Sequence, residues 1–563
     1  MIKAVIFLLF SSFLISAAES ENLPADNFIE INEAIQQTIT AETHPYIKNH
    51  IFLNYKKTLD DLYFLAPQHL LWTTPDNQNI NAAFQLLANA SSSGLNPEYY
   101  NLADLQKRWQ QLNQQEKVSH TEYALLDTAI SINLIHFLSD LHFGRIDPRT
   151  LKPNYNNKNN AITLIPVILE ALNTHKIPEL THKVEPSALA YQQLKKALLD
   201  YQNKDTGRPI INLSYTSSLH PADQSQQITA IRQQLHILEY STDENNISSF
   251  YDQDLANQIK QFQLHHGLNQ DGIIGKNTIK ALNIQPYQRI QMIKLALERF
   301  RWLPKTLASP LIMVNIPAFQ LKAYYPDDKE IGKTQILNMK VIVGKSKKDK
   351  FKSPVFTANM YYLEFSPYWN IPKSIAFDEI LPQLKENPLY LEEHNMELVS
   401  GFHDNETPLV YTEDSFEQLE SGNLMLRQRP GKGNALGKVK FIFPNHYNVY
   451  LHDTPSRHLF RKSKRDLSHG CIRVEKPTEL ARFLLQSKPG WWQKEVIKAM
   501  NLSSPKRVRL NQSIPVIIYY STVSIVQGAV AFYNDIYNYD GKLAKVLIQQ
   551  NQVPATPSFS EKI

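Results

Sequence analysis

The stretch Ser468-His469-Gly470-Cys471-Ile472-Arg473 carries most of the information about the fold and the chemistry of this chain. Cys471 is the only cysteine among 563 residues, so it forms no disulfide within the chain. Gly470 permits a tight turn, in which the backbone N–H groups of neighbouring residues converge on one point. A thiol beside such donors suits attack on an amide carbonyl, because the donors stabilise the developing oxyanion. An inert buried thiol is the alternative interpretation.

A second stretch, Tyr450-Leu451-His452-Asp453-Thr454-Pro455, supplies a candidate base. His452 follows a predicted strand, where it can take the proton of a thiol and later return a proton to a leaving group. The sequence also allows a zinc site formed by His452, His458, His469 and Cys471. We expect no metal, because there is no second cysteine and the spacing of these residues is not that of zinc ligands.

Together the two stretches resemble the signature of the L,D-transpeptidase catalytic domain, also called the YkuD domain. The family pattern is a histidine, about 15 residues, Ser/Thr-His-Gly-Cys, one further residue, and Asn or Arg. Here 15 residues separate His452 from Ser468, and Arg473 fills the last position. Residues 366–372 (Ser-Pro-Tyr-Trp-Asn-Ile-Pro) and 430–437 (Pro-Gly-Lys-Gly-Asn-Ala-Leu-Gly) resemble two further family segments, although the family commonly has Asn where this chain has serine at 366.

The resemblance implies a role for most of these residues. Cys471 would be the nucleophile and His452 the proton acceptor and donor, oriented by the backbone carbonyl of Asp453. The residues that shape the site and its oxyanion hole would be Tyr450, Ser468, His469 and Gly470. Arg473 would either bind a substrate carboxylate or form a structural ion pair, and we prefer the ion pair. Trp369 is a further candidate for substrate contact. No cofactor is implied, because a thioester conserves the energy of the bond that is cleaved.

The resemblance also implies the substrate, which is bacterial peptidoglycan. Cys471 would attack the carbonyl that joins the L-centre of diaminopimelate to the terminal D-Ala of a donor tetrapeptide stem. The diaminopimelate amine of an acceptor stem would then resolve the thioester into a 3→3 cross-link, a step of cell-wall biogenesis that contributes to cell shape. Sensitivity to carbapenems is implied as well, and other cell-wall synthesis proteins are candidate partners. Two alternatives stay open: an L,D-carboxypeptidase, which uses water as the acceptor, and a non-catalytic wall-binding scaffold.

The N-terminus predicts export. Lys3 precedes an apolar run over residues 4–15, which two serines interrupt, and Ser16-Ala17-Ala18 follows. This pattern is typical of a secretory signal peptide over residues 1–18, with cleavage after Ala18 and a periplasmic location; an uncleaved anchor is the alternative. Hydrophobic residues make up 42% of the chain and charged residues 20%, which is typical of globular proteins. The net charge of only +5 does not favour nucleic acid as a partner.

The length of the chain requires several domains, and we predict a multidomain α+β protein. Apolar residues at helical spacing predict a helical scaffold domain over residues 25–220. Residues 225–284 resemble a small three-helix peptidoglycan-binding module, on the residues Phe262-Gln263, His266-Gly267-Leu268 and Asp271-Gly272-Ile273-Ile274-Gly275. Asn277 or Thr278 is expected to cap its last helix. These modules together resemble the large periplasmic YcbB-type L,D-transpeptidases.

A β-rich catalytic domain is predicted over residues 310–550. Five strands are predicted from short apolar runs, at residues 311–316, 339–344, 361–365, 439–443 and 449–452. Residues 377–424 interrupt the domain with polar and helical-looking sequence. We interpret them as an insertion, either a lid-like subdomain over the site or a surface excursion without a gating role.

Overall fold

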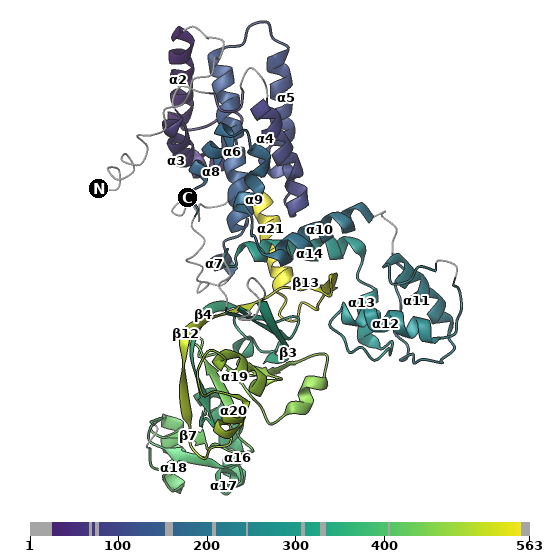
Figure 1. Cartoon of the computed structure of the whole chain (residues 1–563), viewed down its shortest axis with the longest axis vertical. Coiled ribbons are helices and arrows are strands. Elements are labelled where there is room, and N and C mark those ends of the chain that lie inside the picture. Colours follow the sequence, from purple (N-terminus) through teal and green to yellow (C-terminus); the bar gives the residue numbers. More distant parts are fainter. Residues whose placement is uncertain are drawn as a thin grey trace.

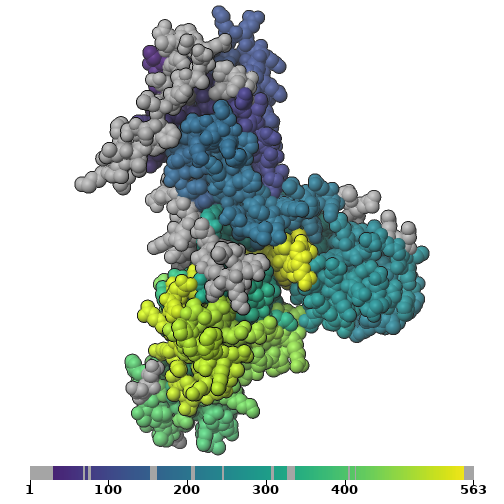
Figure 2. Space-filling model, viewed as in Figure 1, coloured from purple at the N-terminus to yellow at the C-terminus, as the bar shows by residue number. Residues whose placement is uncertain are grey.

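The multidomain α+β class is confirmed by the computed structural model, which describes residues 25–66, 70–73, 78–151, 162–204, 210–243, 246–305, 310–326, 334–403 and 406–552. The expected signal peptide lies outside these residues. A helical domain, a three-helix module and a β-rich domain follow one another along the chain (Figure 1). In the space-filling view of Figure 2 the three-helix module stands to one side of the other two.

Helix α6 (His120–Phe143) is the central element of the helical domain. It is buried around most of its circumference, so it is apolar on nearly all sides rather than on one face. Among the described residues it is the one helix long and apolar enough to cross a membrane, and 89% of that apolar window is buried inside the protein. We therefore interpret α6 as a core helix. The other helices of this domain are α2 (Ala25–Thr40), α3 (Asn49–Leu65), α4 (Gln78–Ala88), α5 (Leu102–Asn113), α7 (Pro148–Leu151), α8 (Leu164–Asn173) and α9 (Leu180–Val184).

Two long helices join the helical domain to the β-rich domain. Helix α10 (Leu189–Lys204) packs along α14 (Pro286–Arg301), as Figure 1 shows. Their apolar faces share one core with strands of the β-rich domain, and Tyr191, Leu297 and Met313 all belong to it. The last part of the predicted helical domain therefore packs at the junction between domains.

The three-helix module has its own core and consists of α11 (Gln226–Ile237), α12 (Gln253–Leu264) and α13 (Lys276–Leu282). The predicted cap of its last helix is wrong, because α13 begins at Lys276 with Gly275 in the capping position. Thr278 is instead 3% exposed inside the helix, and its hydroxyl donates to the carbonyl of Ile273 at 3.3 Å.

The β-rich domain is built on a nine-stranded sheet in the order β10-β3-β11-β9-β8-β4-β12-β1-β2. Strand β2 also pairs with β3, so the sheet closes on itself into a barrel. The five predicted strands correspond to β1, β3, β4, β8 and β9. The strands are β1 (Leu311–Asn315), β2 (Gln320–Pro326), β3 (Thr334–Gly344), β4 (Phe356–Phe365), β8 (Val439–Ile442), β9 (Leu451–His452), β10 (Asp466–Ser468), β11 (Ile472–Val474) and β12 (Lys506–Tyr519). Helices α19 (Pro477–Leu485) and α20 (Gln493–Ala499) pack against the apolar core of this sheet.

The insertion is a small subdomain with a core of its own. It holds a three-stranded sheet in the order β5-β7-β6, which the sequence analysis did not predict. Strands of two to four residues are too short for an alternating pattern to be recognised. Its elements are β5 (Trp369–Asn370), α15 (Lys373–Ile375), the π-helical turn η6 (Ala376–Ile380), α16 (Leu381–Glu386), α17 (Tyr390–Glu393), β6 (Met396–Val399), α18 (Glu413–Ser421) and β7 (Met425–Gln428).

The end of the chain returns to the helical domain. After β12 come the hairpin β13 (Val523–Val526) and β14 (Ala529–Phe532) and then helix α21 (Tyr539–Gln552). Helix α21 contacts α14, and Leu543 packs with Ile146 and Trp302 in a small separate core. This last segment therefore ties the barrel to the helices above it in Figure 1.

Candidate active site

The pairing of β9 with β11 assembles the site. The two strands are parallel neighbours, with His452 opposite Arg473 and the N–H of Ile472 donating to the carbonyl of Tyr450 at 3.1 Å. Cys471 immediately precedes β11 and therefore lies opposite Tyr450, next to His452. The crossover between the strands thus brings together two stretches that are well separated in the sequence.

His452 is held as a neutral base. Its side chain is buried, and Nδ1 lies 2.6 Å from the backbone carbonyl of Asp453. A carbonyl only accepts, so Nδ1 carries the proton and Nε2 is left as a free base. Burial, followed by the positive charges of Arg473 and Lys440, lowers the pKa of His452 to about 3, against the opposing effect of backbone carbonyls.

The thiol of Cys471 is held in its protonated form. Burial raises the pKa of Cys471, and the backbone N–H and hydroxyl of Tyr450 oppose this effect, as do the charges of Lys440 and Arg473. The sulfur lies 3.8 Å from the backbone carbonyl of Asn448. Near neutral pH the resting pair is therefore a thiol and a neutral imidazole, not a thiolate and an imidazolium.

We expect the rate of alkylation of Cys471 by iodoacetamide to keep rising with pH beyond about 8.5, the ordinary pKa of a thiol. Only the thiolate reacts, and the pKa of Cys471 is raised by burial while His452 stays neutral down to about pH 3. The measurement is the alkylation rate between pH 5 and 10, followed by intact mass. A rate plateau that extends down to pH 5 would instead show a preformed thiolate–imidazolium pair.

Two serines hold the backbone of the turn before Cys471. The hydroxyl of Ser468 donates to the carbonyl of Cys471 at 2.6 Å and accepts from the N–H of Gly470 at 3.2 Å. The hydroxyl of Ser353, far away in the sequence, donates to the carbonyl of Gly470 at 2.6 Å. Gly470 has φ +117°, a backbone conformation that other residues rarely adopt.

His469 points toward the insertion. Its Nε2 lies 2.6 Å from a carboxylate oxygen of Glu379 on η6 and 3.0 Å from Nζ of Lys345. Burial lowers the pKa of His469, while Glu379 opposes this effect. Asp378, the neighbour of Glu379 on η6, forms an ion pair of 2.7 Å with Lys350. The insertion therefore directly contacts the turn formed by residues 468–471, here called the catalytic turn because it carries the candidate nucleophile Cys471. The residues of the insertion that make this contact were marked by no sequence motif.

Arg473 lacks the ion pair that we preferred from the sequence, so that interpretation is wrong. Within the described residues Arg473 has no acidic partner, and its buried Nε has no hydrogen-bond partner. Its positive charge is therefore not neutralised by an acidic side chain of the described residues. Lys440, which sequence analysis missed, lies opposite His452 on β8, and its Nζ is 4.1 Å from the ring centroid of Tyr450. The alternation of polar and apolar residues along β8 is the signal that could have marked it.

Trp369 is not brought to this cluster by any contact that the structure describes. It pairs with Gln428 within the sheet of the insertion and is half-buried against the core of that subdomain. His469 and Gly470 line a cavity of about 450 Å³, together with residues at the ends of α7 and α14 and Tyr539. Among the described residues, no group of three His, Cys, Asp or Glu side chains could hold a metal ion.

Three family models match separate parts of the chain. Residues 309–505 match the L,D-transpeptidase catalytic domain, residues 57–198 match a scaffold domain, and residues 224–282 match a model described as "putative peptidoglycan binding domain". The first match includes β9 and β11, and with them Tyr450, His452, Cys471 and Arg473.

A relative and a solved structure add to these matches. The chain is 34% identical over 235 residues to a Haemophilus influenzae protein named "Putative L,D-transpeptidase", covering 41% of this chain and 45% of that protein. The match thus spans less than half of that relative's length. A crystal structure of an L,D-transpeptidase from Xylanimonas cellulosilytica is 13% identical and covers 54% of this chain and 99% of that one, with a TM-score of 0.16. That score is too low to support an argument about the fold.

Proposed function

We propose that this chain forms 3→3 cross-links between peptide stems of peptidoglycan, because residues 309–505 match the L,D-transpeptidase catalytic domain and residues 224–282 match the model described as "putative peptidoglycan binding domain". The observation that supports this most is the parallel pairing of β9 and β11, which sets a lone thiol beside a buried neutral imidazole. A thiol, a base and a turn of backbone donors are the parts that acyl transfer through a thioester needs.

The first half-reaction releases D-Ala. Sγ of Cys471 gives its proton to Nε2 of His452 and bonds to the stem carbonyl next to D-Ala. The N–H of Cys471 and the hydroxyl of Tyr450 would donate to the oxyanion. The C–N bond then breaks, and His452 returns the proton to the amine of D-Ala. In the second half-reaction an acceptor amine attacks the thioester, His452 takes the proton of that amine, and the C–S bond breaks. The proton returns to the sulfur, so no cofactor is consumed.

Arg473 is proposed to bind a carboxylate of the donor stem. We expect Arg473→Met to raise KM for a tetrapeptide donor by about 10-fold or more, because a charge-assisted hydrogen bond contributes about 1.5–3 kcal/mol. Steady-state release of D-Ala gives KM. Arg482→Met is the matched control, because Arg482 is an exposed residue of α19 and is not among the residues of the site. An unchanged KM in Arg473→Met would rule out this role.

The cross-linking activity is tested by the mass of the products. The purified chain is incubated with disaccharide-tetrapeptide muropeptides, and we expect a dimer that has lost one D-Ala. Tripeptide without dimer would identify an L,D-carboxypeptidase, in which water resolves the thioester. Absence of any product and of a carbapenem adduct on Cys471 would identify a non-catalytic wall-binding scaffold.

Location in the periplasm stays a prediction from residues 1–18, and peptidoglycan as the substrate is consistent with it. The mass of the protein recovered from cells would show whether residues 1–18 are removed after export.

A further inference from the structure

The hydroxyl of Tyr537 contacts Ser353, the residue whose own hydroxyl holds the carbonyl of Gly470. Tyr537 lies beyond residue 505, where the match to the catalytic-domain model ends. Its side chain is 1% exposed. The hydroxyl donates to the carbonyl of Gly344 at 2.6 Å and accepts from the N–H of Ser353 at 3.1 Å. Tyr537 therefore joins the end of β3 to the loop that follows it.

Ser353 carries this connection to the nucleophile. It is fully buried, and its hydroxyl accepts from the N–H of Gly344 at 3.0 Å while it donates to the carbonyl of Gly470 at 2.6 Å. The two segments are packed so closely that no side chain fits at Gly344, because a Cβ there would lie 1.9 Å from the carbonyl oxygen of Phe351. The hydroxyls of Tyr537 and Ser353 thus connect the backbone at Gly344, at Ser353 and at Gly470 by hydrogen bonds.

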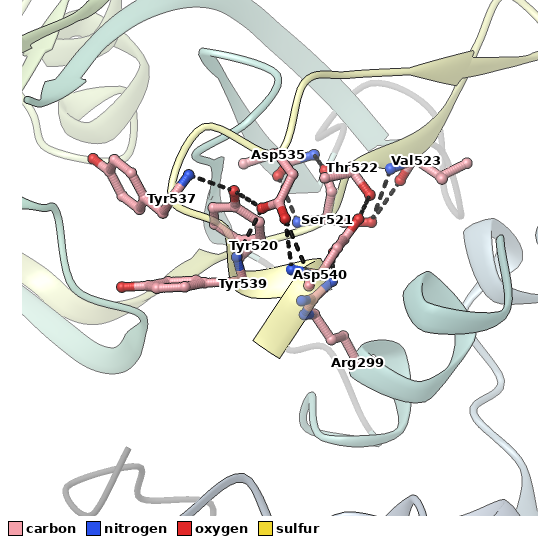
Figure 3. Close-up of polar contacts among 11 residues, drawn as sticks. Arg299, Tyr520, Ser521, Thr522, Val523, Asp535, Tyr537, Tyr539 and Asp540 are labelled. Atoms are coloured by element: carbon pink, nitrogen blue, oxygen red, sulfur yellow. Dashed lines mark hydrogen bonds and ion pairs between the residues drawn. The ribbon is translucent and has the colours of Figure 1, made fainter. Parts of the chain in front are cut away.

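The segment that carries Tyr537 is itself anchored, as Figure 3 shows. The N–H of Tyr537 donates to the hydroxyl of Tyr520 at 3.0 Å, and that hydroxyl donates to Asp535 at 2.5 Å. The carboxylate of Asp535 also accepts from the first backbone N–H groups of α21, those of Tyr539, Asp540 and Gly541. Tyr537 is therefore held both at its backbone N–H and at its side-chain hydroxyl.

Helix α21 is fixed in turn to the junction between domains. The carboxylate of Asp540 accepts hydrogen bonds from Arg299 of α14 and from the hydroxyl of Thr522 (Figure 3). The three groups are buried. A continuous set of polar contacts therefore runs from α14, through Asp535 and Tyr537, to the carbonyl of Gly470.

The fixed carbonyl of Gly470 determines where a donor of the oxyanion hole points. The peptide group between Gly470 and Cys471 is planar, so a fixed C=O also fixes the N–H on its other side. Gly470 has no side chain that packing could hold, and its backbone is free to adopt other conformations. The orientation of the Cys471 N–H thus depends on the hydroxyl of Ser353.

We propose that Tyr537 is a positioning residue for acyl transfer, which acts through Ser353 to aim the N–H of Cys471 at the developing oxyanion. This inference rests on the proposed acyl-transfer function. The C-terminal segment after β12, which lies outside the matched catalytic domain, is then part of the active-site architecture.

Two reagents that react with the sulfur of Cys471 can distinguish a loss of oxyanion positioning from a general loss of folded structure. Acylation of Cys471 by imipenem passes through an oxyanion, whereas alkylation by iodoacetamide displaces iodide and forms none. In the full-length chain we expect Tyr537→Phe to slow acylation by about 10- to 100-fold, because removal of a whole oxyanion donor costs about 100- to 1,000-fold. Its alkylation rate should stay within about two-fold of wild type. Ser353→Ala should show the same split.

Tyr533→Phe is the matched control. It removes the same atom from the same segment, but the hydroxyl of Tyr533 pairs with that of Ser524 at 2.8 Å, away from the turn. We expect wild-type rates with both reagents. The proposal is overturned if Tyr537→Phe and Ser353→Ala are acylated at the wild-type rate, or if both reactions slow equally. A wild-type chain that is not acylated at all would instead contradict the proposed function itself.

Discussion

Cross-linking and D-Ala release are expected to fall by about 10,000-fold or more when Cys471 is replaced by alanine. The reason is that the described site offers no second nucleophile, and a covalent intermediate cannot form without the sulfur. The mass adduct with a carbapenem should disappear completely in the same variant. Dimer formation from muropeptides and intact mass after carbapenem treatment measure the two effects separately.

Two histidine variants accompany this experiment, one of which is expected to be inactive and the other to be active. His452→Ala should lose nearly as much activity, and the double variant should be no slower than Cys471→Ala, because the two residues act as one unit. His458→Ala is the matched control, since His458 is exposed on the loop that connects β9 to β11. Any cross-linking that survives in Cys471→Ala would remove the cysteine from the mechanism.

The residues of the site that lie within two short stretches of the chain could be predicted from the sequence. His452, Ser468, Gly470 and Cys471 were marked because residues at fixed spacing flank two strands, and a closed barrel places those strands side by side. Ser366 illustrates how a departure from the family pattern can be understood only in the structure. Its φ is +47°, and asparagine tolerates this left-handed conformation better than serine does.

The contacts that the sequence could not predict are long-range. Ser353 contacts Gly470 from 117 residues away, and Glu379 contacts His469 from the insertion. Tyr537 acts through Ser353 from a segment near the end of the chain, and none of the three belongs to a recognisable motif. The missing ion pair of Arg473 has the same origin, because a partner for a charge depends on which strands are neighbours. Local patterns encode elements and turns, whereas tertiary packing decides which polar groups meet.

Asp127 is a further residue that sequence analysis missed, because it lies within the long apolar helix α6. Its carboxylate is fully buried and has no cationic partner among the described residues. It accepts five hydrogen bonds, from the hydroxyl of Tyr63, from the backbone N–H groups of Leu71, Trp72 and Thr73, and from the Thr73 hydroxyl. A buried carboxylate is tolerated only when it is hydrogen-bonded in this way.

We expect Asp127→Ala to destabilise the helical domain by about 3–5 kcal/mol, because several buried N–H donors lose their acceptor at once. Asp127→Asn should cost nearly as much, since its amide places a donor against donors. Hydrogen exchange of residues 70–73 and denaturant unfolding measure the effect. Asp61→Asn is the control, because Asp61 is exposed and lies 4.0 Å from Lys57.

The same variant tests whether the helical domain and the barrel are independent in stability. The apolar core around α6 contains no residue of the barrel, whose core is a separate cluster. Acylation of Cys471 by imipenem at 25 °C should therefore persist in Asp127→Ala even where residues 70–73 exchange rapidly. If acylation is lost together with the protection of those amides, the junction formed by α10, α14 and α21 couples the two domains into one cooperative unit.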